Sequence, residues 1–400
     1  MAVPGARISV SNDVGVLRDA LVQGPVCSPL TGSVAVAKNG AASAVRQHAR
    51  LVRELEAAGV TVRHFDALLY SALEFADARD WILERRVGEC EDDRRRASEI
   101  ISWLSEKPVE TLTRYLMEGM RLSALPSGFD RTAYGARNPG GWFLSPLGDV
   151  IHPRALVRFL DGGAVIALPD PEASHAAAIN ISTVLNFAPL FDESRFEFWL
   201  TSDGADRSFP PIDGHDIAMP GGMVCVGAIT GATSAQALSR LAISLFRQGK
   251  ADTMFWIDLT GVECGCLDDC FLPLSRDCLL VNMEILNLAP VCKVRGRRHN
   301  AVLGVEPCGS AFIEELSKAV GVAGFCLIDT NHYSGTAGKA LAALSPVVLG
   351  PGRILAFEEH HAAFALLEQN GIEVVSAFAG SALSRNGKGP RGLVTALWTD

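Results

Sequence analysis

The chain is 400 residues long, which suits two or three average domains or one large domain with an insertion. Hydrophobic residues make up 48% of it and charged residues 20%, which is typical of a well-buried globular protein and excludes a disordered chain. The net charge of −9 argues against a nucleic acid or a membrane surface as partner, because both need basic patches.

The N-terminal stretch "MAVPGARISVSNDVGVLRDALV" has no basic region followed by an apolar run, so we expect no signal peptide. No uncharged apolar run reaches the length needed to span a bilayer. We therefore expect a cytoplasmic protein. In that compartment the ten cysteines are more often free thiols, ligands or nucleophiles than a disulfide framework.

The first part of the chain predicts a βαβ-like unit over residues 6–66. "ARISVS" and "RDALVQG" read as short strands, "AASAVRQHARLVRELEAAGV" (41–60) as an amphipathic helix with a glycine stop, and "TVRHF" as the next strand. Residues 67–125 then show continuous helical periodicity rich in Arg and Glu, which predicts a helical insertion.

From residue 126 to the C-terminus, short strands alternate with helices. "GAVIAL", "MVCVGAI", "CLLVN", "FCLID", "RILAF" and "IEVVSAF" read as strands, whereas "SAQALSRLAISLFRQ" and "SAFIEELSKAV" read as helices. Such alternation suits a sheet or a closed ring of similar modules. We predict an α/β domain made of residues 1–66 and 126–400, with 67–125 inserted.

Several segments in this order resemble the arginine deiminase family of guanidine-modifying enzymes. They are "VSNDVGVLRDALVQGP", "ARDWILERRV", "DGHDIAMPGGMVCVGAITGATSAQALSRLA", "CLDDCFLPLSRD" and "NGIEVVSAFAGSALSRNGKGPRGLV". The resemblance implies the pentein fold, a five-bladed α/β propeller whose site lies in its central well. It also implies a homo-oligomer that acts on a small molecule without a cofactor.

The same resemblance places the family's catalytic groups on residues that cannot repeat its chemistry. The nucleophilic cysteine falls at Gly392, and the histidine of the His-Leu-Asp segment falls at Cys266, while its aspartate is kept as Asp268. The acid that grips the guanidinium becomes Asp213, and the glycine after it becomes His215. Without a thiolate at Gly392 the attack on a guanidinium carbon is lost.

Further positions carried over by the resemblance belong to the substrate pocket. A second guanidinium-binding aspartate maps onto His152 of "DVIHPRALV", and the arginines that hold a substrate carboxylate fall at Ala232 and Gly387. The residues expected to bind the substrate are Asp13, Asp216, Arg391 and Gly392. A guanidinium needs paired carboxylates to be desolvated, so this pocket predicts a substrate other than arginine.

Three chemistries remain open for the remaining residues. Acid–base catalysis by His152, His215, Asp213 and Asp268 would hydrolyse, transfer, dehydrate or cyclise a small metabolite at a C–N bond. A strand over 266–272 would place Cys266, Asp268 and Cys270 on one face, and Cys266 would be a relocated nucleophile with His152 or His215 as its base. Cys264, Cys266 and Cys270 would alternatively hold a metal, or simply fill the core. The rival to all three is a catalytically silent protein that binds a metabolite or a partner protein.

Overall fold

The fold is taken from a computed structural model of the chain. It describes residues 8–25, 38–129, 140–147, 150–171, 173–192, 196–201, 209–297, 302–384 and 387–400. No helix in these ranges is both long and apolar enough to cross a membrane.

Five sheets repeat one pattern of strand pairing, in which the first and second strands are antiparallel and the second and third are parallel. They are β19–β1–β2 (Thr395–Thr399, Leu17–Val22, Thr61–His64), β5–β6–β7 (Val157–Leu160, Gly163–Ile166, Glu197–Leu200), β8–β9–β10 (Ile217–Gly221, Val224–Ile229, Thr253–Asp258), β11–β12–β15 (Phe271–Ser275, Cys278–Val281, Cys326–Asp329) and β16–β17–β18 (Val347–Gly350, Arg353–Phe357, Glu373–Phe378). This repetition is the arrangement predicted for a pentein, and the pairing of β19 with β1 joins the two ends of the chain in one sheet.

A helix connects the second and third strands of each of these sheets, because a parallel pair needs a crossover. The crossover helices are α1 (Lys38–Ala57), α8 (His175–Phe187), α10 (Ala235–Arg247), α12 (Phe312–Val320) and α14 (Phe364–Gln369). Shorter elements between them are α9 (Pro189–Asp192), α11 (Met283–Leu288), α13 (Gly335–Ala342), η4 (Gly309–Ala311), η5 (Thr330–His332) and η6 (Glu358–Ala363). The strands β13 (Val291–Arg297) and β14 (Val302–Pro307) extend the third sheet. The strands and helices predicted from the quoted segments of 126–400 are thereby confirmed.

Local sequence explains why one of these helices forms where it does. The Ser234 hydroxyl caps α10 by accepting a hydrogen bond from the amide of Ala237 at 3.2 Å. Leu238, Leu241 and Leu245 follow at helical spacing and are fully buried. The apolar face of α10 therefore lies against the sheet.

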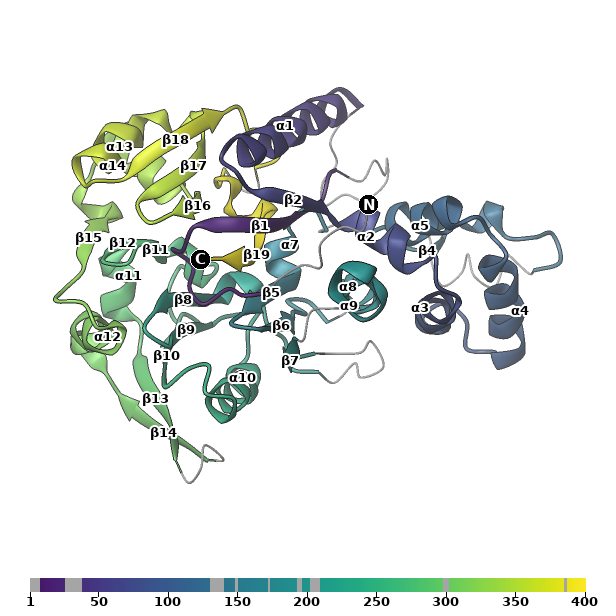
Figure 1. The fold of residues 1–400 in the computed structure, drawn as a ribbon, viewed down its shortest axis with the longest axis horizontal. Helices are drawn as coiled ribbons and strands as arrows, with labels where there is room; N and C mark the ends of the chain where they lie inside the picture. The colour runs from purple at the N-terminus through teal and green to yellow at the C-terminus, as the bar shows by residue number, and fades with distance from the viewer. Residues whose placement is uncertain are drawn as a thin grey trace.

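The predicted helical segment consists of four helices that lie together at the right of Figure 1. They are α2 (Phe65–Ala72), α3 (Ala76–Gly88), α4 (Arg94–Ser105) and α5 (Val109–Glu118), followed by η1 (Leu122–Ala124) and the short pair β3 (Met120–Arg121) and β4 (Trp142–Leu144). Both α2 and α3 pack on α8. The apolar residues of the four helices belong to one cluster with those of β5 and β6. The proposed limits of the insertion stay a prediction.

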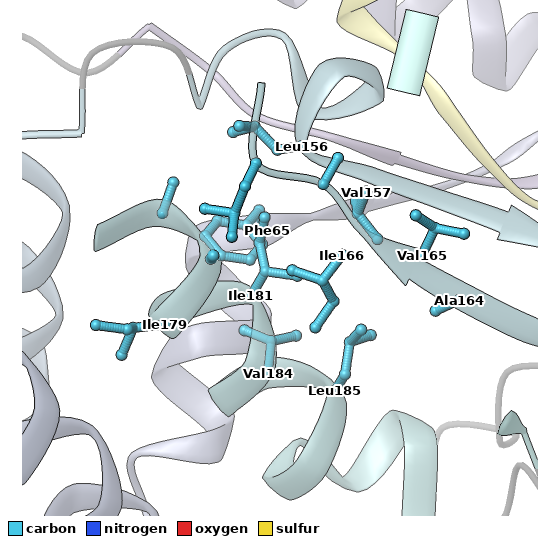
Figure 2. Packing of buried hydrophobic residues seen from close by; sticks show 14 of the residues in the cluster. Phe65, Leu156, Val157, Ala164, Val165, Ile166, Ile179, Ile181, Val184 and Leu185 are labelled. Atoms are coloured by element: carbon cyan, nitrogen blue, oxygen red, sulfur yellow. The ribbon is translucent and has the colours of Figure 1, made fainter. Parts of the chain in front are cut away.

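The helix α8 is buried nearly all round, because the helical segment covers it on one side and the sheet on another. Figure 2 shows Ile181 and Val184 of this helix close to Val157 and Ile166 of the β5–β6 pair. These side chains are at most 3% exposed. Burial of a large aliphatic side chain of this kind contributes roughly 1.5–3 kcal/mol.

Two strand predictions are wrong. The described part of "ARISVS", residues 8–11, forms no strand, and Ser9 makes only an isolated bridge to Trp398. Residues 266–272 do not form a strand: Leu267–Asp269 form a 3-10 turn, η3, and the strand β11 begins only at Phe271. The sequence-based expectation that Cys266, Asp268 and Cys270 share one strand face therefore fails. The carboxylate of Asp216, which immediately precedes β8, accepts the Leu267 amide at 2.9 Å and fixes the turn instead.

Candidate active site

Short turns that immediately precede the first strands of four sheets carry the predicted site residues. These turns are α7 (Pro153–Leu156), η2 (Gly214–Asp216), η3 (Leu267–Asp269) and η7 (Pro390–Leu393), and they lead into β5, β8, β11 and β19. Because the sheets repeat one pattern, equivalent turns meet although they are far apart in the sequence. Contacts join α7 to η7, α7 to η2 and η2 to η3.

Two imidazoles converge on Gly392. A Cβ atom at this position would lie 3.1 Å from Nε2 of His215 and 3.2 Å from Nδ1 of His152. These are tight contacts, so the two rings occupy the space that a side chain at residue 392 would need. The predicted grouping of His152, His215 and Gly392 matches this geometry.

His215 and Asp213 form a hydrogen-bonded dyad. The ring Nδ1 of His215 lies 2.9 Å from Oδ1 of Asp213, and the same oxygen accepts the His215 amide at 2.8 Å. An ionised carboxylate only accepts hydrogen bonds, so Nδ1 donates and Nε2 carries the free lone pair toward Gly392. Each side chain of the pair is 17% exposed, which leaves the dyad accessible to a small molecule.

Asp216 is a buried acid with a different environment. Its Oδ2 accepts hydrogen bonds from the hydroxyls of Thr230 at 2.7 Å and Thr233 at 2.5 Å. Burial, followed by the charge of nearby Asp213, raises the pKa of Asp216 to about 7. Asp216 therefore organises η2, η3 and the 230–233 turn rather than offering a free carboxylate to a ligand.

The raised pKa of Asp216 predicts a pH-dependent stability. Between these two pKa values the folded chain holds a proton on Asp216 that the unfolded chain has released. This residue's contribution to stability is therefore fully present below the unfolded pKa of 3.8 and is lost as pH rises to and through about 7. Relative to the Asp216→Asn variant, the free energy of unfolding should fall by about 2 kcal/mol between pH 5 and pH 7. Urea titrations of both proteins at several pH values measure it. If the free energy of unfolding of the wild type minus that of the variant stayed constant or rose with pH, Asp216 would not be a buried protonated acid.

Asp268 is neutralised by two buried arginines. Arg154 donates from Nε to Oδ2 at 2.9 Å and from Nη2 to Oδ1 at 3.2 Å, and Arg391 donates from Nε to Oδ1 at 3.1 Å. Burial alone would raise the pKa of Asp268, but the two guanidinium groups outweigh it and hold this pKa well below its usual range. The predicted catalytic Asp268 is thus a permanently charged anchor.

Cys266 lies near these acids but is poorly suited to be a nucleophile. Burial, together with Asp269 and Asp268, raises the pKa of the Cys266 thiol far above its ordinary value. The reactive form of cysteine is the thiolate. The burial and the neighbouring acids of Cys266 therefore argue against the relocated thiol.

The neighbouring cysteines interact with each other rather than form an evident metal site. Cys264 donates its thiol to the carbonyl of Cys266 at 3.2 Å and shares a hydrogen bond with the Cys270 thiol. Within the described part of the chain, no group of three or more His, Cys, Asp or Glu side chains is arranged to hold a metal ion. The alternative of a metal centre at Cys264, Cys266 and Cys270 gains no support.

The predicted substrate-binding residues Asp13 and Arg391 lie in a buried ion network. Asp13 accepts Arg158 Nη2 at 2.7 Å and the Met219 amide at 3.0 Å, and its Oδ2 lies 3.6 Å from Arg391 Nη2. Sequence reasoning missed Arg154 and Arg158, the partners of the two acids. Their spacing in "HPRALVR", four residues apart at a turn before a strand, was the available signal.

Comparison with known proteins agrees with this fold. The family model described as arginine deiminase matches residues 41–398. An amidinotransferase of the saxitoxin biosynthetic pathway from Microseira wollei superposes with a TM-score of 0.54 at 12% identity, covering 98% of this chain and 97% of that one.

Two more solved structures share the fold at the same low identity. DDAH from Pseudomonas aeruginosa, solved with citrulline, has a TM-score of 0.50 at 12% identity and covers 95% and 99% of the two chains. An inosamine-phosphate amidinotransferase from Streptomyces griseus has a TM-score of 0.50 at 12% identity and covers 98% and 97%. The family model covers most of the chain, and the sheets and the turns α7, η2, η3 and η7 (the central turns) agree with that match. The chain therefore belongs to the arginine deiminase family.

Proposed function

We propose that this protein is a divergent enzyme of the family that acts at a C–N bond of a small, uncharged substrate by acid–base catalysis. The observation that carries the proposal is the placement of His215 Nε2 beside Gly392, with Asp213 on the other ring nitrogen. A histidine oriented by a carboxylate is the standard arrangement of a general base. No covalent adduct to the enzyme is needed.

The surrounding charges argue against a guanidinium substrate. Asp213 is engaged by His215, Asp268 by two arginines, and the pKa of Asp216 is raised to about 7. A delocalised cation needs free paired carboxylates to replace its hydration. A neutral substrate fits this set of groups better.

The catalytic step follows from the dyad. His215 Nε2 takes a proton from a water molecule or from the substrate, and the resulting imidazolium is stabilised by Asp213 through Nδ1. The proton is then returned to the leaving nitrogen. His152, which faces the same space, is placed to donate or accept a second proton.

A substrate panel tests the proposal. The purified protein is incubated with arginine and with neutral carboxamides, ureas and cyclic imides, and ammonia and products are measured by mass spectrometry. We expect no citrulline from arginine and turnover of at least one neutral compound. Conversion of arginine to citrulline would contradict the proposal.

The rival interpretation, a catalytically silent protein, is supported by one observation, the loss of the thiol at Gly392. It predicts that a compound of the panel raises the melting temperature without being consumed. Saturable binding with no turnover of any panel member or of a small-molecule cell extract would favour this rival and overturn the enzymatic proposal.

Restoring the cysteine should not restore arginine hydrolysis. In Gly392→Cys the new Cβ must push the His215 and His152 rings aside by a few tenths of an ångström, because it meets them at 3.1 and 3.2 Å. Gly392→Ala is the matched control, since it adds the same Cβ without sulfur. We expect both variants to lose about 1–3 kcal/mol of unfolding free energy and neither to make citrulline. Arginine turnover in the cysteine variant alone would show that the guanidinium pocket survives.

The expectation of a homo-oligomer also stays a proposal. The strand β14 ends the five-stranded sheet and exposes Val302 and Val305, each at nearly half of its surface. An exposed apolar sheet edge is a surface on which a second chain can pair. Light scattering after size exclusion measures the mass directly.

A further inference from the structure

A surface pocket, called the hollow below, is lined by charged residues of the buried ion network described above. Its volume of about 390 Å³ includes open solvent outside the protein surface. Three arginines and one aspartate are among its lining residues, namely Arg154, Arg158, Arg391 and Asp13. None of His152, His215, Asp213 and Gly392 lines it. The hollow is therefore distinct from the proposed acid–base site.

The charges of the network do not cancel. Three arginines, each at most 5% exposed, face two carboxylates, Asp13 and Asp268, whose side chains are at most 4% exposed. One positive charge is left over. A buried charge without a counter-ion is costly, so an excess cation beside a hollow favours an anion there.

Two buried donors of the same arginines also lack hydrogen-bond partners in the described structure. They are Nη2 of Arg391 and Nε of Arg158. The Arg391 Nη2 atom lies 3.6 Å from Asp13 Oδ2, which is beyond hydrogen-bond distance. Native proteins rarely leave such groups unsatisfied, because an unmade hydrogen bond in the interior is costly.

Two of the three arginines are also destabilised by their surroundings. Burial and the charge of Arg154 lower the pKa of Arg158 to about 10 and also lower the pKa of Arg391. An anion between them would remove this repulsion.

The rest of the wall defines the ligand class. Leu17, Val347, Val348, Val394 and Ala396 are apolar, and Thr399 is the remaining lining residue. A single excess charge matches a monoanion better than a sulfate or phosphate dianion. Guanidinium groups recognise carboxylates through paired N–H donors.

We propose that this hollow is a binding site for a small monocarboxylate with a short aliphatic body, held by Arg391 and Arg158 and packed against Val347 and Ala396. The carboxylate completes the ion network of the central turns. The site binds without chemistry, so its test is independent of the enzymatic proposal.

Calorimetric titration with sodium butyrate, at constant ionic strength, tests the site. We expect saturable binding with one butyrate per chain, a matching rise in melting temperature, and no saturable signal from sulfate. Saturation by chloride but not by butyrate would overturn the carboxylate assignment. Equal, unsaturable responses to all three salts would show that there is no site.

Two variants test whether butyrate binds in the hollow, and neither removes a buried charge. Ala396→Leu fills the hollow from a partly exposed position and should weaken butyrate binding at least tenfold. Arg18→Gln removes an exposed arginine, which pairs with Asp400 at 2.6 Å, and should leave binding unchanged. Unchanged affinity in Ala396→Leu, or loss in Arg18→Gln, would place the binding elsewhere and overturn the proposal.

Discussion

A His215→Asn variant is expected to turn over the substrate that the panel identifies about 10²–10⁴-fold more slowly than the wild type, with a much smaller change in KM. Asparagine keeps the size and some of the polarity of the side chain but has no ring nitrogen to take a proton beside Gly392. The interaction lost is therefore one that matters in the transition state. Steady-state kinetics on both proteins measure the ratio.

The chain contains a matched control for this experiment. His332 Nδ1 lies 3.0 Å from Oδ2 of Asp329, so the same residue pair recurs at a surface turn where the imidazole is 78% exposed. His332→Asn should leave kcat unchanged. If His215→Asn kept the full activity of the wild type, His215 would have no catalytic role. If His215→Asn and His332→Asn lost the same share of activity, the loss would reflect general stability.

Replacement of Asp268 by asparagine is expected to lower the free energy of unfolding by about 3–5 kcal/mol. The substitution preserves shape but leaves the buried Arg154 and Arg391 guanidinium groups without the carboxylate that receives three of their hydrogen bonds. Removing one partner of a buried ion pair is costly because the remaining charge stays desolvated. Urea denaturation at pH 7 gives the difference.

The adjacent residue provides the control. Asp269 pairs with Lys388 at 2.9 Å, but both side chains are about one-third exposed, so Asp269→Asn should cost less than about 1 kcal/mol. A loss at Asp268 no larger than the loss at Asp269 would mean that the ion network does not stabilise the central turns.

Periodicity in the sequence predicts most individual elements but not the five-fold repetition. The strand β1, the helix α1 and the strand β2 lie close to the ranges predicted from "RDALVQG", 41–60 and "TVRHF". What repeats is the pattern of backbone strand pairing. Different side chains are compatible with that pattern in each sheet, so no residue motif repeats in the sequence. Only the resemblance to a family indicated it.

The site was predictable where it depends on the family pattern and unpredictable where it depends on tertiary contacts. The meeting of Gly392 with His152 and His215 follows from equivalent turns at the starts of different sheets. The strand expected at 266–272 fails because the Asp216 carboxylate of η2, about 50 residues away in the sequence, fixes a turn there. Such a contact leaves no local periodicity. Likewise, the low pKa of Asp268 depends on Arg154 and Arg391, which are more than 110 residues away.

The most direct test of the altered site is competitive alkylation followed by peptide mass spectrometry. The protein is treated in parallel with neutral iodoacetamide and with 2-chloroacetamidine, a thiol alkylator that carries a guanidinium-like cation. The exposed Cys326 serves as the internal standard in both reactions. We expect Cys326 to be modified by both reagents and Cys266 by neither. Alkylation of Cys266 by the amidine ahead of Cys326 would reveal a thiolate in a cation-binding pocket and contradict the account.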